Sequence, residues 1–250
     1  MENYQGLAQI YDYLLSGIDY ENWANYLERL LEYFKIEPVK SVVDLACGTG
    51  NSTFPWARRG YRASGVDISA EMLALAQKKA GELQLAVDFY RQDLRELALP
   101  FKADLAVLYQ DGLNYLLTEG ELQKALQSVH GVLNPSGHFI FNINLVEKLP
   151  AGNVAEVSWL DEDDLTLIWE SNLEEGGKIW RIKLTAFSRQ ENGFYEKIRE
   201  EHRERSYLPE EIEPLLLKTG WKIRACYKAF TFERPSGQDR NIFYIVQRGA

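Results

Sequence analysis

The feature of this chain that most constrains its fold is an apolar segment that breaks into a glycine turn. Residues 42–54 read Val-Val-Asp-Leu-Ala-Cys-Gly-Thr-Gly-Asn-Ser-Thr-Phe, so an apolar run carrying Asp44 is followed by Gly48 and Gly50. The Asn, Ser and Thr residues that come next are typical of a helix N-terminus. Glycine adopts backbone angles closed to other residues and lets a ligand lie against the main chain. This order predicts a strand, a tight turn and a helix, the arrangement with which α/β folds bind a nucleotide or a similar cofactor.

The acid that follows this turn indicates what kind of cofactor it binds. Asp67 ends the next apolar run, 19 positions beyond Gly48, near the interval of roughly 20 residues at which a carboxylate can meet ribose hydroxyls. The dinucleotide fingerprint has a third glycine where this chain has Thr53. The carboxylate of Asp44 would also repel a phosphate but suit an ammonium group. These features favour a nucleoside cofactor without phosphates, and an NAD-dependent oxidoreductase is the less favoured alternative.

Hydrophobic periodicity predicts helices and strands in alternation along most of the chain. Helices are expected at 21–35, 52–59, behind an N-cap at Ser69 and at 119–133, and strands at 41–46, 62–67, 85–90, 103–108 and 137–145. A helix at 209–219 and strands at 221–230 and 240–248 end the chain. Such alternation is typical of a parallel sheet covered on both faces. The predicted fold is α/β, a Rossmann-like, mostly parallel seven-stranded sheet with helices on both faces.

A second, smaller unit is predicted after Pro150. Alternating runs separated by turn residues predict an antiparallel meander of four strands, at 155–160, 164–172, 178–187 and 194–206. Between Ala151 and Ser206 the chain has 13 acids against 8 bases. Such a region suits a neutral or cationic small molecule, or a dimer contact, better than a polyanion. We expect a cofactor-binding domain of residues 1–149 and 207–250, with residues 150–206 as a β insertion that forms a lid or acceptor region.

Charge and composition narrow the range of partners. The net charge of −9 and the pI near 5.0 disfavour a nucleic-acid substrate, which needs a basic face. No apolar run reaches the roughly 18 residues of a membrane span, and the N-terminus lacks the layout of a signal peptide. Three scattered histidines and two cysteines give neither a metal-ligand spacing nor a disulfide framework. We expect a cytoplasmic monomer or homodimer that acts on a small molecule, without a metal, a nucleic-acid partner or a membrane partner.

Four short motifs follow one another along the chain. They are Asp-Leu-Ala-Cys-Gly-Thr-Gly at 44–50, Val-Asp-Ile-Ser at 66–69, Gln-Asp-Leu at 92–94 and Leu-Asn-Pro-Ser-Gly-His-Phe at 133–139. In this order they resemble the motifs of the class I S-adenosylmethionine-dependent methyltransferases, with Ser136 in place of a glycine in the last one. The resemblance covers residues 4–148 and 206–248, and the opening Tyr11-Asp12 is similar to the N-terminal helices of the small-molecule enzymes in this group.

The resemblance implies that S-adenosylmethionine is the cofactor and indicates which residues hold it. It implies that Asp67 binds the ribose hydroxyls, that Asp44 binds the methionine ammonium group, and that Asp93 and Leu94 bind the adenine. Tyr11 would cover the methionine part of the cofactor. The full set of cofactor residues that the resemblance implies is Tyr11, Asp44, Ala46, Gly48, Gly50, Asp67, Ile68, Met72, Asp93, Leu94 and Gln110.

The sequence assigns no catalytic residue and leaves the acceptor molecule open. Asp111 and Tyr115 follow the fourth strand, at the edge where ligands of open α/β sheets bind, so they are candidates to face the acceptor. His202 is another candidate base, but its charged neighbours are more simply explained as a solvated strand or helix face. Positioning contributes up to ~7–11 kcal/mol to such a reaction, so a methyltransferase does not need an obvious triad. We expect methyl transfer to an O, N or C atom of a small molecule; the alternative is a non-catalytic or regulatory S-adenosylmethionine-binding protein.

Overall fold

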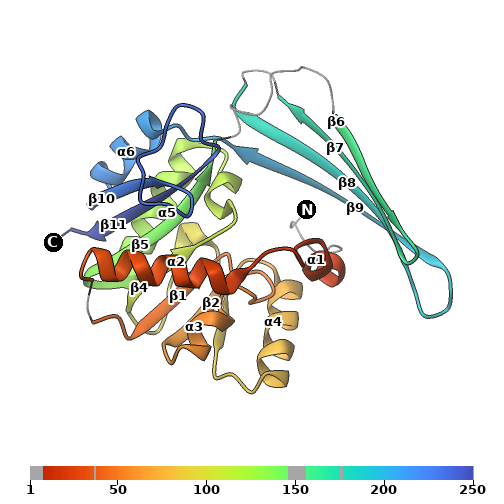
Figure 1. Ribbon diagram of the computed structural model, residues 1–250, viewed down its shortest axis with the longest axis horizontal. Coiled ribbons are helices and arrows are strands. Elements are labelled where there is room, and N and C mark those ends of the chain that lie inside the picture. Colours follow the sequence, from red (N-terminus) through yellow and green to blue (C-terminus); the bar gives the residue numbers. More distant parts are fainter. Residues whose placement is uncertain (1–7, 37, 146–155, 175–176, 250) are drawn as a thin grey trace.

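The computed structural model describes residues 8–36, 38–145, 156–174 and 177–249, and it contains two separate sheets (Figure 1). The larger sheet is built from seven strands, β1 (Ser41–Leu45), β2 (Arg62–Asp67), β3 (Asp88–Arg91), β4 (Ala103–Leu108), β5 (Leu133–Asn144), β10 (Trp221–Lys228) and β11 (Asn241–Arg248). Their order is β10-β11-β5-β4-β1-β2-β3. The pairs among the first five strands are parallel, whereas β11 is antiparallel to both of its neighbours. The predicted fold class is confirmed.

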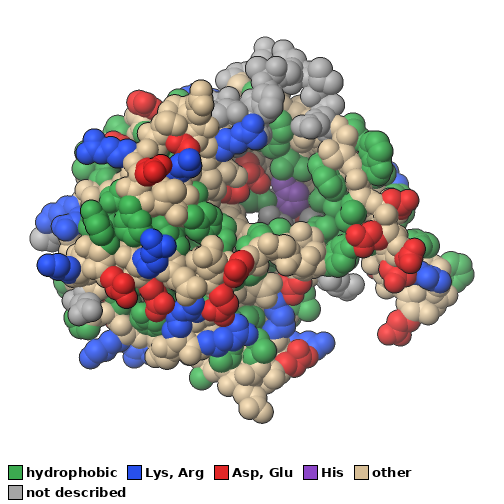
Figure 2. All heavy atoms as spheres, in the orientation of Figure 1, with side chains coloured by type: hydrophobic (Ala, Val, Ile, Leu, Met, Phe, Trp, Pro, Cys, Tyr) green, Lys and Arg blue, Asp and Glu red, His purple; other side chains and the backbone are tan. Residues whose placement is uncertain are grey.

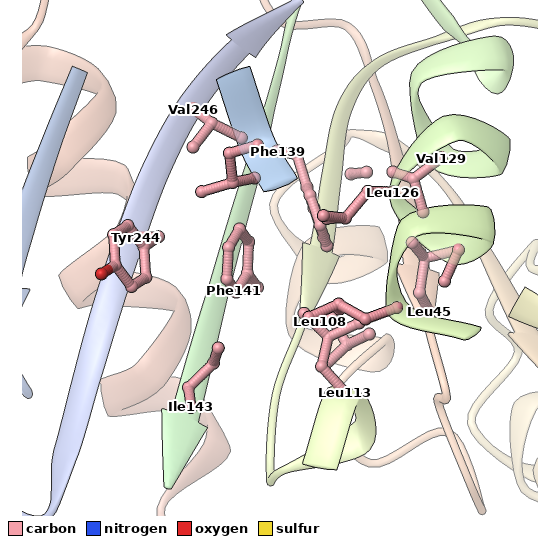
Figure 3. Packing of buried hydrophobic residues seen from close by; sticks show 14 of the residues in the cluster. Leu45, Leu108, Leu113, Leu126, Val129, Phe139, Phe141, Ile143, Tyr244 and Val246 are labelled. Carbon is pink, nitrogen blue, oxygen red and sulfur yellow. The ribbon is translucent and has the colours of Figure 1, made fainter. Parts of the chain in front are cut away.

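Helices cover both faces of this sheet, because successive side chains of a strand point to opposite sides. Val42 packs with the cluster that contains α2 (Tyr20–Tyr33) and α3 (Phe54–Arg58). Its neighbour Val43 packs with the cluster that contains α5 (Glu119–Val132) and α6 (Pro209–Lys218). Figure 3 shows part of this second cluster, where side chains of α5 meet those of the central strands. Two packed layers of helix therefore hold the strand ends in place.

Most predicted elements are found within two residues of their expected bounds, and two strands differ more. The strand expected at 85–90 begins at Asp88, because α4 (Ala70–Glu82) is followed by a turn in which Gln84 has a positive φ of 54°. The strand expected at 137–145 begins directly after α5, at Leu133, with a register shift against β4 before His138. The predicted N-cap of α4 is confirmed, since the Ser69 hydroxyl accepts a hydrogen bond from the Met72 N–H.

The second sheet is the predicted four-stranded antiparallel meander. Its strands are β6 (Glu156–Glu162), β7 (Leu165–Leu173), β8 (Ile179–Arg189) and β9 (Tyr195–Arg205). It arches away from the larger sheet and over α1 (Ala8–Leu14) (Figure 1). Ile10 of α1 belongs to a small apolar cluster with Leu167, Ala186 and Ile198 of this sheet. The predicted domain boundary between residues 149 and 150, and the predicted strand start at 155, lie outside the described residues.

Neither a membrane-spanning helix nor a metal-binding cluster is present among the described residues. None of the helices in these ranges is both long enough and apolar enough to cross a membrane. Within the same ranges, no group of three His, Cys, Asp or Glu side chains is arranged to hold a metal ion.

Candidate active site

A cavity of about 320 Å³ lies at the edge of the larger sheet where β1, β2 and β4 end. It is lined by every residue of the predicted cofactor set except Asp44 and Gly50. Residues outside that set also line it, among them Tyr20, Thr49, Asn51, Ser52, Gln92, Arg95, Tyr109, Gly112, Tyr115 and Leu116. The first three of the four motifs, which are far apart in the sequence, therefore meet around one cavity. The fourth motif does not line it.

The glycine turn forms one wall of this cavity. Gly48 and Gly50 have φ angles of +53° and +83°, in the left-handed region that favours glycine. A Cβ atom on Gly50 would lie 2.8 Å from Cζ of Phe54, so this glycine keeps the turn packed on α3 from below. Gly48 faces the cavity, and the ring of Tyr11 lies beside it. The first glycine thus exposes backbone to a ligand, and the second shapes the turn.

Asp67 joins the end of β2 to the glycine turn. Its Oδ2 accepts a hydrogen bond from Gly48 N at 2.8 Å and its Oδ1 accepts one from Ser69 N at 2.9 Å. Burial raises the pKa of this carboxyl group, and the backbone donors oppose the rise. An ionised carboxylate has about four acceptor sites in all, so the backbone donors of Gly48, Ser69 and Ile68 leave acceptor capacity for a donor in the cavity. This geometry fits two ribose hydroxyls, and that role stays a prediction.

Asp44 lies beneath the turn and does not line the cavity. Its Oδ2 accepts hydrogen bonds from Ser52 Oγ at 2.7 Å and Thr53 Oγ1 at 2.6 Å. Burial raises the pKa of Asp44 to about 7. Its Oδ1 is buried and has no hydrogen-bond partner within the described part of the chain. An unpartnered acceptor here fits an ammonium group or a bridging water, as S-adenosylmethionine would require. The contact with the ammonium group stays a prediction.

Asp93 has two roles at the opposite wall of the cavity. Its carboxylate caps the short helix η1 (Leu94–Glu96) by accepting from Arg95 N at 2.8 Å. The same carboxylate pairs with the Arg95 guanidinium at 2.5 Å, which lowers the pKa of Asp93. Asp93 and Leu94 also line the cavity, together with the buried Met72. Helix capping and cofactor contact are therefore compatible here, and Arg95 is a lining residue that the sequence analysis did not identify.

The N-terminal helices close the cavity from outside. Asp12 of α1 accepts hydrogen bonds from Thr49 and Asn51 of the glycine turn and pairs with Lys79 Nζ at 2.7 Å. The Tyr20 hydroxyl donates to Gln110 Oε1 at 3.2 Å, across the mouth of the cavity. These contacts hold α1 against the glycine turn and the start of α2 against Gln110.

The chain beyond β4 turns sharply at the border of the cavity. Gln110 and Asp111 are successive residues with positive φ angles of 50° and 66°, a backbone conformation that is costly outside glycine and often marks functional sites. Asp111 accepts hydrogen bonds from Asn142 Nδ2 at 3.0 Å and Asn144 Nδ2 at 2.6 Å. Burial raises the pKa of Asp111 to about 6. Side chains of β5 thus orient this carboxyl group next to the cofactor cavity.

One face of β9 completes this region, and here the sequence interpretation was wrong. The run around His202 was explained as a solvated face, but His202 is only 5% exposed. Its Nδ1 lies 3.2 Å from the Tyr115 hydroxyl and its Nε2 lies 3.2 Å from Oε2 of Glu200. Glu204 lies on the same face, hydrogen-bonds Tyr115, and has a pKa raised to about 7 by burial and by Asp111.

The other face of β9 is the solvated one. Glu201 and Arg203 are exposed and pair with Arg181 and Glu174. Alternation along a strand places Glu200, His202 and Glu204 together on the opposite face. This period of two was the signal that could have grouped these three residues on one face, once a strand was predicted, although it does not say which face is covered.

Comparisons with known proteins indicate the family of this chain. A family described as a methyltransferase domain matches residues 42–137. The methyltransferase-family protein YqeM of Bacillus subtilis (strain 168) is 31% identical over 251 residues, which cover 98% of this chain and 97% of YqeM. A methyltransferase-family protein of Geobacillus sp. (strain WCH70) is 27% identical over 98% of this chain and 99% of its own length.

Solved structures give the same result. The crystal structure of an S-adenosylmethionine-dependent methyltransferase from Clostridium acetobutylicum ATCC 824 matches with a TM-score of 0.86 and 29% identity, covering 100% of both chains. DesVI of Streptomyces venezuelae shares the fold, with a TM-score of 0.76 and 21% identity over 97% of this chain and 98% of DesVI. The chain therefore belongs to the class I S-adenosylmethionine-dependent methyltransferases.

Proposed function

We propose that this enzyme transfers the methyl group of S-adenosylmethionine to a small molecule that binds between the larger sheet and β9. The observation that carries this proposal is the extent of the cavity. It runs from the glycine turn to Gly112 and Tyr115, and Tyr115 contacts His202 of the β insertion. Tyr115 thus connects the cofactor cavity with the inward face of β9 in the insertion.

The bound cofactor supplies a sulfonium-activated methyl group, which the lone pair of a nucleophile takes as the carbon–sulfur bond breaks and its electrons stay on sulfur. The chain's own residues hold the partners in line. Asp67 would accept the ribose hydroxyls, Asp44 would face the ammonium group, and Asp93 would lie at the adenine. Such positioning is worth up to ~7–11 kcal/mol.

Several features support a small acceptor. A hollow lies between the insertion and the main body, with acidic side chains and a histidine inside it (Figure 2). The net charge of −9 disfavours a polyanionic acceptor. DesVI shares this fold, as does CalS10, which is described as an amino pentose methyltransferase. We further propose a cytoplasmic location, because Cys47 and Cys226 are both free thiols.

The test is calorimetric titration of the purified chain with S-adenosylmethionine and S-adenosylhomocysteine, with NAD as the control. We expect micromolar binding of the first two and none of NAD. Transfer of a labelled methyl group to a deproteinised extract of bacterial metabolites then tests turnover. Binding of NAD would contradict the cofactor assignment, and tight cofactor binding without any labelled product would favour the non-catalytic alternative.

A further inference from the structure

We infer that the acceptor of this methyltransferase carries an amino group, which enters as an ammonium ion and binds between Asp111 and Glu204. This inference rests on the proposed function, since it names the class of molecule that occupies the acceptor side of the same site. It is argued from the hydrogen-bonding capacity of the residues that border the cofactor cavity.

The two carboxyl groups are near enough for the charge of Asp111 to raise the pKa of Glu204. Asp111 lies between Gln110 and Gly112, which both line the cofactor cavity, and Glu204 of β9 hydrogen-bonds Tyr115, another lining residue. No Lys or Arg of the described ranges forms an ion pair with either acid, and Arg205 next to Glu204 pairs with Glu211 at 3.0 Å and Glu119 at 3.6 Å instead. Buried charges are normally paired, so these acids lack the partner that a bound cation would supply.

A second, independent observation points to a ligand with several donors. The amide of Asn142 is fully buried and directs its Nδ2 at Asp111. Its Oδ1 has no hydrogen-bond partner in the part of the chain that the structure describes. A buried acceptor without a partner costs about 1–3 kcal/mol. The site therefore offers acceptors from Asp111, Glu204 and Asn142 and needs donors in return.

An ammonium group is the small-molecule group that meets this need best. It carries a positive charge and three N–H donors, whereas a hydroxyl has one donor and no charge. A carboxylate or phosphate would be repelled by both acids. An apolar group would leave the acceptors unsatisfied. The chemistry of the site thus favours an amine over an alcohol, an acid or a hydrocarbon.

The same residues can prepare the amine for attack. An ammonium ion has no free lone pair, so one N–H bond must break first, with its electron pair remaining on nitrogen and the proton forming an O–H bond with Glu204. A carboxylate whose pKa is raised to about 7 is suited to take that proton. Tyr115 hydrogen-bonds Glu204 and lies 3.2 Å from His202 Nδ1. Tyr115 and His202 are positioning residues here, and Glu200 holds the imidazole from its other side.

The inference is tested with the purified full chain, methyl-labelled S-adenosylmethionine and a deproteinised extract of bacterial metabolites. One half of the extract is treated with N-hydroxysuccinimidyl acetate, which acylates amines, and the other half is mock-treated. We expect blocking to lower label transfer by about tenfold or more, and the labelled product to bind a cation-exchange resin near neutral pH. Equal transfer to both halves, or a neutral or anionic product, would overturn the inference. Absence of product from both halves would contradict the proposed function itself.

Matched variants locate the effect. Glu204→Gln should lower kcat/KM for the labelled acceptor about tenfold or more, remove a pH dependence near pH 7, and leave S-adenosylhomocysteine affinity within about twofold. Asp111→Asn should lower kcat/KM similarly, and it serves as the readout if Glu204→Gln does not fold. Glu201→Gln changes a glutamate on the solvated face of the same strand and should behave as wild type. Wild-type rates and pH profiles in both inward variants would overturn the inference.

Discussion

The cofactor side and the proposed acceptor side of the site hold their carboxyl groups in different ways. On the cofactor side, Asp67 is fixed by the backbone N–H groups of Gly48 and Ser69, which lie in the turns that follow β1 and β2. On the acceptor side, Asp111 and Glu204 are held by side chains, from β5 and from Tyr115. Backbone donors are available to any sequence that forms the turn, whereas side-chain partners change with each substitution. The cofactor side is thus defined by the fold, and the acceptor side by particular residues.

The largest expected effect is on the cofactor side. Asp67→Ala should weaken S-adenosylmethionine binding by about tenfold or more, because a hydrogen bond to a charged group is worth about 1.5–3 kcal/mol. Calorimetric titration measures this affinity. Asp164→Ala removes an exposed acid of the insertion and is the control that should bind normally. Unchanged affinity in a folded Asp67→Ala protein would remove the ribose assignment.

A second prediction separates stability from binding at Asp44. Its pKa is about 7 in the folded chain and about 3.9 in an unfolded one. As pH rises between these values, the unfolded state releases a proton that the folded state keeps, so the free energy of unfolding falls. Between roughly pH 5 and pH 8, the free energy of unfolding should therefore fall by about 2 kcal/mol less in Asp44→Asn than in the wild type.

Calorimetric melting without ligand checks this. The drop in Tm between the two pH values should be a few degrees smaller in Asp44→Asn than in wild type, while cofactor binding becomes weaker. Parallel pH profiles of the two proteins would show that Asp44 ionises normally in the folded chain. Unchanged S-adenosylmethionine binding by Asp44→Asn would show that Asp44 does not contact the ammonium group.

The third prediction concerns the residue shared by both sides. Tyr115→Phe should lower kcat/KM for methyl transfer by about tenfold while S-adenosylhomocysteine affinity stays within about twofold. The ring that lines the cavity is kept, and only the hydroxyl that contacts His202 is lost. Tyr195→Phe, which removes an exposed hydroxyl, is the control. A parallel loss of S-adenosylhomocysteine affinity would show that the two sides are not separable.

The smallest expected effect compares two neighbouring lysines of α4. Lys79 pairs with Asp12 at 2.7 Å and its side chain is 22% exposed, whereas Lys78 pairs with Glu82 at 3.9 Å and is 71% exposed. Lys79→Ala should weaken S-adenosylmethionine binding about threefold through a looser α1, while Lys78→Ala should have no effect, since exposed pairs contribute little. Equal titration curves for the two variants would show that the Asp12 contact does not support the cofactor site.

The comparison also explains what the sequence could predict. The glycine turn, the acid at the end of β2 and the alternation of strands with helices are local patterns, and the fold class is as predicted. Thr53 departs from the dinucleotide fingerprint, and the structure gives the reason. Its side chain is fully buried and donates to Asp44, a contact that a third glycine could not make. The inference that the cofactor is not a dinucleotide therefore depended only on residues close together in the sequence, Asp44 and Thr53.

The acceptor side could not be predicted to the same extent. His202 and Tyr115 are 87 positions apart, and they meet only because β9 returns to the short helix η2 (Gly112–Tyr115). Alternation along β9 gives two faces, but the sequence does not say which face another element will cover. Charged residues on both faces led to the wrong choice for His202, since Glu200 and Glu204 look as polar as Glu201 and Arg203.

The position of α1 has a consequence for exchanging parts between relatives. Ile10 packs into the core of the β insertion, while Asp12, two residues later, is bound to the glycine turn and to Lys79. A chimaera that replaces only residues 156–205 would place a foreign sheet on a native helix. To transfer substrate preference, a chimaera would have to exchange residues 8–14 together with the strands, although more than a hundred positions of chain separate the two segments.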